Sequence, residues 1–298
     1  MIGADTAAEL KIEIDSIAAR PDGASTIPAA IAAELIARHR LASTAELALF
    51  ALATAGAMAR PAISSYRVAA VGIEAETGDL LLGANLEFAG SELTTTIHAE
   101  GFVALRARNR GRTLATLAVR EAHPCAHCRQ TLSESAAAEG LTLVDLQGNT
   151  LTLGDLYPWP FGPGALGVAG DIAGRRGWPN LVFAAPAPPA AFAAPLLEAA
   201  ARAHAPYSRA PSAVVLRTAD GGLHAAGCAE SVAFNPSISA LQAALVEVVA
   251  ARQDPALISE AWLGLTEGGS VDPEPGFRAL LRAVALGAIA QVARWRLG

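Results

Sequence analysis

The sequence contains little of what marks several common classes of protein. It has three cysteines in 298 residues, an odd number and too few for a disulfide framework. Only 17% of its residues are charged, the net charge is −6 and no Lys/Arg-rich run occurs, which argues against a polyanion as the main partner. The most apolar uncharged stretch, residues 181–197, is interrupted by four prolines. The sequence therefore predicts no nucleic-acid partner and no membrane-spanning segment.

The amino terminus also lacks the features of a signal peptide. "MIGADTAAELKIEID" has acidic residues where such a peptide needs a basic region followed by an apolar one, so we expect a cytoplasmic protein in a reducing compartment. Apolar residues make up 52% of the chain, which is ample for a large core. The length suits one large domain or two domains of about 100–200 residues each.

Helix-like and strand-like patterns alternate along the first half of the chain. Ser43 with Glu46 forms a capping box that predicts a helix ending near Arg60. "YRVAAVGIE" and "DLLLGANLEF", on either side of the turn residues Thr77-Gly78-Asp79, predict a β-hairpin. Further on, the patterns predict a helix over 94–109, a strand over 114–120, a helix over 124–140, and strands over 141–146 and 151–156. This alternation is typical of the α/β class.

A second unit repeats the layout of the first. "PYSRAPSAVVLRTADGGLHAAGCAESVAF" follows the order of features in "AISSYRVAAVGIEAETGDLLLGANLEF", which indicates a duplication. Where the first copy has "TIHAEG", the second has "ALQAAL", so the second is expected to lack the chemistry of the first. The predicted organisation is a helical extension over 1–48, a first unit over 49–165, a linker rich in Gly, Pro and Ala over 166–190, and a degenerate copy over 191–298.

Two of the three cysteines, Cys125 and Cys128, lie directly behind Pro124. Residues three apart share one face of a helix, and the first helical turn favours thiolates through its free N–H groups and dipole. The pair suits a soft or borderline divalent metal, with zinc the leading candidate. A lone C-x-x-C also occurs in redox motifs and zinc knuckles, and the third cysteine, Cys228, is expected to be a small apolar residue.

The rest of the coordination sphere must come from elsewhere in the sequence. A structural zinc site needs four protein ligands, and no second C-x-x-C exists, whereas a catalytic site needs three ligands and an open position. His127 points about 100° away from Cys128 on a helix, and His123 precedes a proline and is biased toward an extended conformation. The other histidines outside "HAE" lie in the extension or the second unit: His39, His204 and His224. His98 remains, with Glu100 two residues further on.

The pattern H-x-E…P-C-x-x-C is the known signature of zinc-dependent nucleobase deaminases. By this resemblance, His98, Cys125 and Cys128 hold one Zn²⁺ per chain. The open position then binds a water whose pKa falls toward neutrality, and Glu100 acts as the general acid–base.

Over most of its length from about Ala59, the chain resembles cytidine deaminases in their long, two-domain form, which is a homodimer in bacteria. The segments that carry the resemblance are "GANLEF", "TIHAEG", "HPCAHCRQ", "PFGP", "HAPYSRAPS" and "AESVAFNPSISALQAAL". It implies a cytidine-deaminase-like α/β/α sandwich, duplicated, behind an N-terminal helical extension. It also implies hydrolytic deamination of cytidine and 2′-deoxycytidine to uridine and 2′-deoxyuridine with release of ammonia, in pyrimidine salvage.

The same resemblance assigns residues to the nucleoside. Asn85 and Glu87 match the pair that grips the ribose 3′-hydroxyl, with Leu86 between them. The resemblance further places Tyr66 and Phe161 as walls of the pyrimidine pocket, the backbone of Ala99 and the carbonyl of His123 against the base, and Phe234 of the second unit in the site of the partner subunit.

Some residues depart from the family pattern and leave alternatives open. Tyr66 stands where phenylalanine is usual, and Ala122 and His123 replace an aromatic and a small hydroxyl residue before the proline. These changes leave room for a modified cytosine nucleoside, such as a nucleoside antibiotic, as substrate. A non-catalytic pyrimidine-binding module, an editing enzyme acting on nucleic acid and a purely structural zinc protein are weaker alternatives.

Overall fold

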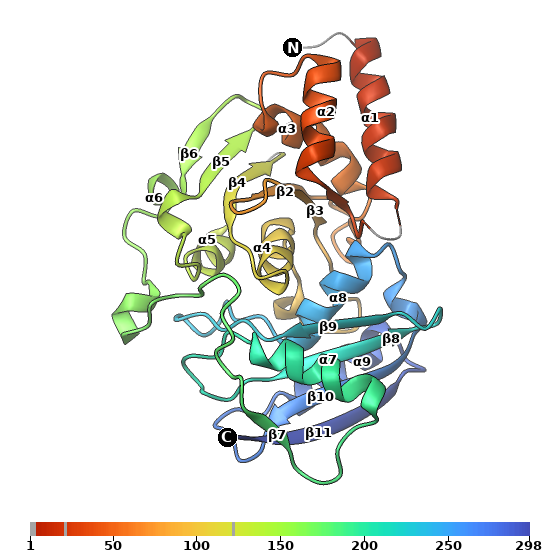
Figure 1. Ribbon diagram of the computed structural model, residues 1–298, viewed down its shortest axis with the longest axis vertical. Helices are drawn as coiled ribbons and strands as arrows, with labels where there is room; N and C mark the ends of the chain where they lie inside the picture. Colours follow the sequence, from red (N-terminus) through yellow and green to blue (C-terminus); the bar gives the residue numbers. More distant parts are fainter. Residues whose placement is uncertain (1–3, 21–22, 121–122) are drawn as a thin grey trace.

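The computed structural model describes residues 4–20, 23–120 and 123–298, which form two α/β units stacked along the long axis of the molecule (Figure 1). The amino-terminal half contains α1 (Ala4–Ala18), β1 (Thr26–Ile27), α2 (Ala29–His39), α3 (Thr44–Gly56), β2 (Ala69–Glu74), β3 (Leu80–Ala84), α4 (Ala99–Asn109), β4 (Leu114–Val119), α5 (Ala126–Leu132), β5 (Thr142–Asp145), β6 (Thr150–Thr152) and α6 (Leu153–Leu156). The rest contains β7 (Leu181–Phe183), α7 (Ala190–Ala201), β8 (Ala213–Thr218), β9 (Leu223–Gly227), α8 (Ala240–Ala250), β10 (Ile258–Thr266), α9 (Glu274–Val284) and β11 (Ile289–Leu297).

The first sheet has the strand order β1-β3-β2-β4-β5-β6, with β4 and β5 parallel and its other neighbours antiparallel. Its central strand β2 is buried throughout because helices cover both faces. Successive residues of β2 point to opposite faces of the sheet. On one face, the side chain of Ala69 lies next to Gly56 in α3. On the other face, a Cβ at Gly72 would lie 3.4 Å from Val103 in α4. The unit is therefore a helix–sheet–helix sandwich.

The second sheet repeats this arrangement with the order β7-β11-β10-β8-β9. The β8–β9 hairpin corresponds to β2–β3, and the parallel pair β10–β11 corresponds to β4–β5. Strand β7 takes the edge position that β6 has in the first sheet, although it precedes the unit in sequence. The structure thus confirms the α/β class and the duplication.

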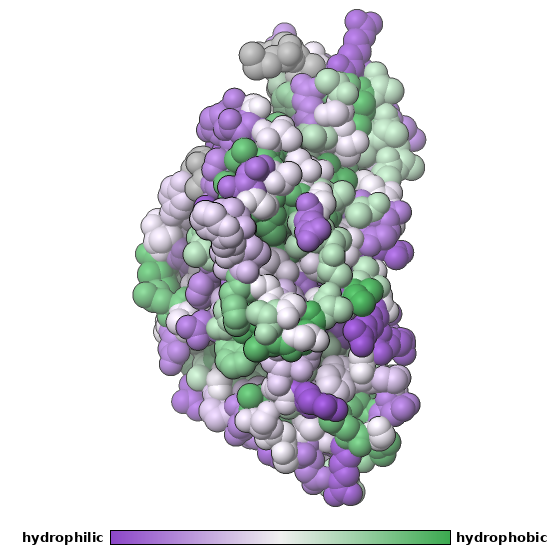
Figure 2. All heavy atoms as spheres, turned by 90° about the vertical axis from the view of Figure 1, so that its left-hand side faces the viewer, coloured by the Kyte–Doolittle hydropathy of each residue, from purple (hydrophilic) through white to green (hydrophobic). Residues whose placement is uncertain are grey.

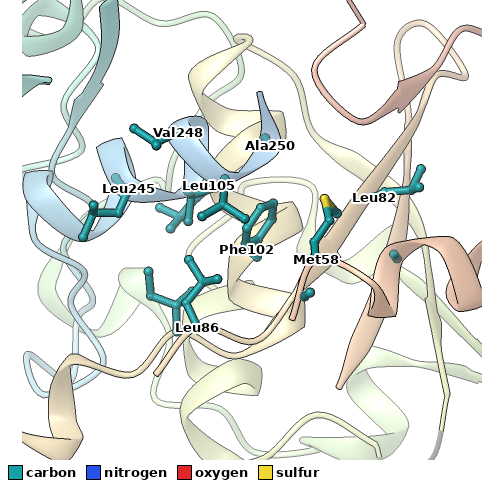
Figure 3. Close-up of a cluster of buried hydrophobic side chains, with 14 of the residues drawn as sticks. Met58, Leu82, Leu86, Phe102, Leu105, Leu245, Val248 and Ala250 are labelled. Carbon is teal, nitrogen blue, oxygen red and sulfur yellow. The ribbon is translucent and has the colours of Figure 1, made fainter. Parts of the chain in front are cut away.

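The two units share one hydrophobic core. Figure 3 shows Phe102 and Leu105 of α4 next to α8, and their side chains are buried in the same apolar cluster as Leu245 and Val248 of α8. Burying this much apolar surface between α4 and α8 couples the second unit to the helix that follows His98.

The amino-terminal extension is fixed to the first unit. β1 pairs with β3 through Thr26 and Leu81, and α1 packs against α3 with Leu10 and Ile14 fully buried. The predicted boundary at residue 48/49 falls inside α3.

Several element boundaries differ from those predicted. The helix predicted from residue 94 begins at Ala99, since the β-branched run 94–97 disfavours a helix. The helix predicted over 124–140 ends at Leu132, where Glu134 and Ala136 pair with Asp171 instead. The helix from Ser43 ends at Gly56 rather than near Arg60, residues 153–156 are helical rather than extended, and the predicted linker 166–190 contains strand β7.

Within the described ranges, no helix combines the length and apolarity needed to cross a membrane.

Gly264 in β10 allows a close approach between two strands. A Cβ there would lie 2.0 Å from the ring of Trp295, which is fully buried and donates from Nε1 to Thr266. We expect Gly264→Ala to lower the free energy of unfolding by about 2–3 kcal/mol through overpacking, measured by urea denaturation. The matched control is Gly276→Ala in α9, where a Cβ meets nothing within 4 Å, and which should stabilise by about 0.5–1 kcal/mol. Equal unfolding curves for the two variants would contradict this account of Gly264.

Candidate active site

The structure brings His98, Cys125 and Cys128 together. The Nδ1 atom of His98 lies 3.4 Å from each sulfur, and the two sulfurs are 3.6 Å apart. A tetrahedral zinc with bonds of about 2.3 Å to sulfur and about 2.0 Å to nitrogen separates sulfur from nitrogen by about 3.5 Å and sulfur from sulfur by about 3.8 Å. The three atoms therefore fit zinc, and no fourth His, Cys, Asp or Glu joins them within the described part of the chain.

Two helix starts position these ligands. His98 is the N-cap of α4, with extended dihedral angles, and Cys125 is the N-cap of α5, with Cys128 in the first turn. The positive ends of both helix dipoles thus point at the group and favour negative charge on sulfur. His98 and Cys125 are exposed, whereas Cys128 is buried.

The protonation states of the three ligands depend on one another. Hydrogen bonds from Cys128 and His98 lower the pKa of Cys125 to about 3. The bond to Cys125, with burial, raises the pKa of Cys128, and the bond to Cys125 also raises the pKa of His98. The close contact of the three groups favours negative charge on sulfur, the form of cysteine that binds a divalent cation.

Glu100 lies behind the metal ligands in the first turn of α4. Its side chain is 5% exposed, and burial raises the pKa of its carboxyl group although it hydrogen-bonds to Cys128 and lies close to the His98 ring. A buried carboxyl with a raised pKa beside a metal site suits proton transfer near neutral pH.

Asn85, Leu86 and Glu87 follow β3 and lie beside the metal ligands. Leu86 pairs with Ile97 by two backbone hydrogen bonds, of 2.8 and 2.9 Å, and this pairing places His98; its own side chain is buried in the core. The amide of Asn85 accepts from the backbone of Val68 and donates to the backbone of Tyr66, at 2.9 Å each. Both polar atoms of Asn85 thus hold the loop before β2.

Glu87 is held by Ser64, a partner that the sequence did not predict. Its carboxylate accepts from the backbone N–H groups of Ile63 and Ser64, at 2.8 Å each, and from the Ser64 hydroxyl. Burial alone would raise the pKa of Glu87, but these bonds outweigh it and the pKa is lowered, with a contribution from His98. Ser208 and Glu230 of the second unit make the same set of bonds. The presence of a serine and a glutamate at matching places in both copies is the sequence signal that could have predicted this contact.

The aromatic residues assigned to the pocket lie at the surface. Tyr66, Phe161 and Phe234 are 53%, 48% and 62% exposed. Phe234 has a positive φ of 62° and its ring lies 6.2 Å from that of Tyr207. These side chains do not close a pocket over the metal ligands within one chain.

The remaining predicted contacts lie close to the two helix starts. Ala99 is the fully buried first residue of α4. The His123 ring lies 3.1 Å from the buried carboxylate of Asp145, and Ala122 lies outside the described residues. Gln130 was not foreseen: it sits in α5 after Cys128, donates to the carbonyl of Phe161 at 2.8 Å, and thereby fixes the loop that carries this aromatic.

The second unit has other residues at the corresponding positions. The pairing of Ala229 with Ile238 repeats that of Leu86 with Ile97, so Ser239, the N-cap of α8, stands where the first unit has His98. The predicted match of "TIHAEG" to "ALQAAL" was therefore wrong by three residues. The N-cap of α9 is Pro273, with Gly276 three residues further on, where α5 has Cys125 and Cys128. This set offers no comparable metal site.

A hollow of about 460 Å³ adjoins the metal ligands, and its walls come from both units. They include His98, Gly101, Cys128, Pro236, Ile238 and Gln242. A separate hollow of about 890 Å³ lies at the junction of the units and contains none of the three metal ligands.

A duplicated α/β/α sandwich with a His-Cys-Cys group at two helix starts and a buried glutamate two residues beyond the histidine defines a zinc-dependent hydrolase of the deaminase type. The profile described as "Cytidine and deoxycytidylate deaminase zinc-binding region" matches the chain twice, over residues 43–142 and 182–272. The chain belongs to the cytidine deaminase family. It is a hydrolase, and its metal is zinc.

Two bacterial relatives agree with this assignment. The cytidine deaminase of Cronobacter sakazakii is 39% identical over 224 residues, which is 73% of each chain. That of Aliivibrio fischeri is 34% identical over 229 residues, which is 77% of this chain and 75% of the relative. The crystal structure of cytidine deaminase from Mycobacterium tuberculosis is 28% identical and covers 37% of this chain and 91% of its own, with a TM-score of 0.32.

Proposed function

We propose that the protein hydrolyses cytidine and 2′-deoxycytidine to uridine and 2′-deoxyuridine, releases ammonia, and serves pyrimidine salvage in the cytoplasm. The observation that carries this is the buried Glu100 beside a three-ligand metal group. Bound zinc would supply Lewis-acid activation of the attacking water. His98, Cys125 and Cys128 would hold it, and a reducing compartment would keep both thiols available.

Glu100 carries the protons in this proposal. Its carboxylate accepts a proton from the attacking water and delivers it to the ring nitrogen. It then accepts a second proton, from the hydroxyl that the attack has added to the ring carbon, and delivers that proton to the departing amine. Burial suits this role, because a raised pKa brings the carboxyl closer to the pH at which it must both accept and donate. The backbone of Ala99, one residue earlier in α4, and the carbonyl of His123 orient the base.

The sugar is assigned to the loop that follows β3. Glu87 remains ionised and can accept from the ribose 3′-hydroxyl, while Ser64 and Ile63 hold its carboxylate in place. Asn85 has one further N–H and one further lone pair beyond its two backbone bonds, so it can contact the same hydroxyl. Leu86 contributes through its backbone.

A homodimer would complete the site. The metal ligands His98 and Cys125 are exposed, as are Tyr66, Phe161 and Phe234, which are assigned to the pyrimidine pocket and to the partner's site. Figure 2 shows apolar residues in an irregular band across the middle of the face that carries β5, β6 and α6. Exposed apolar surface of this kind marks interaction sites, and a second copy would exclude water from the reacting groups.

Ammonia release and zinc content, measured on one sample, test this function. We expect about one zinc per chain and turnover of cytidine and deoxycytidine, with much slower turnover of cytosine because the free base lacks the contact to Glu87. Tight nucleoside binding without ammonia would identify a binding module instead. A strong preference for an N4-substituted or antibiotic cytosine nucleoside would instead favour a specialised enzyme in which Tyr66 alters the pocket wall.

A further inference from the structure

Both helices that begin at metal ligands end on the second unit. α4 begins at His98 and ends with Arg108 and Asn109, and α5 begins at Cys125 and is followed by Glu134. The polar side chains at these far ends are buried or half-buried, and they meet groups of the second unit and of the segment that connects the units.

Glu134 makes three of these contacts. Its carboxylate is 5% exposed and accepts from the backbone N–H of Val232 at 2.6 Å, the Tyr207 hydroxyl at 2.8 Å and Nε2 of His204 at 3.2 Å. All three donors belong to the second unit. A buried carboxylate with three donors is strongly held, and removing it would leave those donors unsatisfied.

The end of α4 joins the same cluster. Arg108 lies 2.8 Å from the carboxylate of Asp171 and donates to the carbonyl of Arg202 at 2.5 Å. The backbone N–H of Asp171 in turn donates to the carbonyl of Glu134 at 2.6 Å. The ends of both metal-bearing helices are thus tied to one another and to the second unit.

A further contact lies at the ligand end of α4. Gln242 in α8 donates from Nε2 to the carbonyl of Thr95 at 2.9 Å, three residues before His98. The second unit therefore holds the chain on both sides of this ligand.

The length of α5 makes this support necessary. The helix has seven residues, too few to be stable without packing, yet it carries two ligands whose sulfurs must stay 3.6 Å apart and 3.4 Å from His98. Ligands placed on a short helix need their geometry fixed by groups outside the helix.

We propose that the second unit, although it has no comparable metal group of its own, positions the zinc ligands of the same chain, and that Glu134 is the positioning residue through which it holds α5. The proposal rests on the zinc site and not on the choice of substrate. Zinc retention is measured without any nucleoside, so failure of this proposal and failure of the proposed reaction are distinguishable.

The test compares zinc release by three variants of the full-length zinc protein. Glu134→Gln removes the charge between the units, and Tyr207→Phe removes only the hydroxyl that donates to Glu134. Glu230→Gln is the matched control, because this carboxylate also receives three bonds, from Tyr207 and Ser208, but all of them lie within the second unit. Zinc transfer to a chromogenic chelator and unfolding in urea are followed on each protein.

We expect Glu134→Gln to release zinc about tenfold faster than the unaltered protein. Groups that hold metal ligands in place without binding the metal affect metal affinity by about this factor. Tyr207→Phe should change the rate in the same direction by a smaller factor. Glu230→Gln should lose stability in urea but release zinc at the original rate. Two results would overturn the proposal. One is zinc release at the original rate in both Glu134→Gln and Tyr207→Phe, and the other is equal acceleration in Glu230→Gln. If Glu134→Gln does not fold, the release rate of Tyr207→Phe decides.

Discussion

Glu100→Gln should retain about one zinc per chain and lose about 10³–10⁴-fold in kcat for cytidine. The substitution keeps the shape of a side chain that is 5% exposed and leaves the three metal ligands unchanged, but it removes the group that accepts and returns protons. Because glutamine cannot take up the proton of the attacking water, the loss should appear in kcat more than in KM.

Metal analysis and ammonia release on the same preparation check this expectation. Glu92→Gln is the control: this carboxylate is exposed, lies eight residues earlier in the chain, and contacts Thr94 rather than the metal group. Its kcat should stay within twofold of the original value. Substantial turnover by a zinc-loaded Glu100→Gln protein would remove Glu100 from the role proposed for it.

The candidate metal ligands could be predicted from the sequence because their types are rare and their spacing is regular. Three cysteines leave few ways to build a soft metal site, and one histidine with a nearby glutamate completes the pattern. The structure brings His98, Cys125 and Cys128 to contact distances although 27 residues separate the histidine from the first cysteine. The duplication was also visible, since β8 and β9 repeat the hairpin β2–β3.

The features that the sequence did not predict depend on contacts between residues that are far apart in the chain. The prediction that α5 extends to Gly140 was wrong, because residues 134 and 136 pair with Asp171, a partner more than 30 residues away. The resemblance to the family implied that Asn85 binds the sugar, but only the structure shows that its amide bonds to the backbone of Tyr66 and Val68. Glu134 carries no recognisable local motif, and its role emerges from three donors of the second unit.

The shared contact of Glu87 and Glu230 shows what the duplication kept. In each unit a glutamate accepts from two backbone N–H groups and one serine hydroxyl on the loop that precedes the central hairpin. In the first unit the carboxylate lies close enough to His98 to affect its pKa, whereas Ser239 stands at that place in the second. Both copies therefore share this turn, and only the first copy carries the metal ligands.

Cys125→Ser and Cys128→Ser should each yield protein with far less than one zinc per chain and no measurable deamination. Each substitution replaces a sulfur, which zinc prefers, by a hydroxyl that stays protonated and leaves two protein ligands in place of three. Cys128 is buried and contacts Glu100, so its loss should also lower stability more than the loss of the exposed Cys125.

Cys228→Ser is the matched control for both. This thiol is 8% exposed, lies in the second unit, and is placed beside Ser212, so the variant should keep its zinc and its turnover. Metal content after dialysis against a weak chelator separates the three proteins. If Cys228→Ser lost zinc as readily as Cys125→Ser, the metal would not sit between α4 and α5. Because the group at His98 has three members within the described residues, each of the two ligand variants leaves two of its ligand atoms in place.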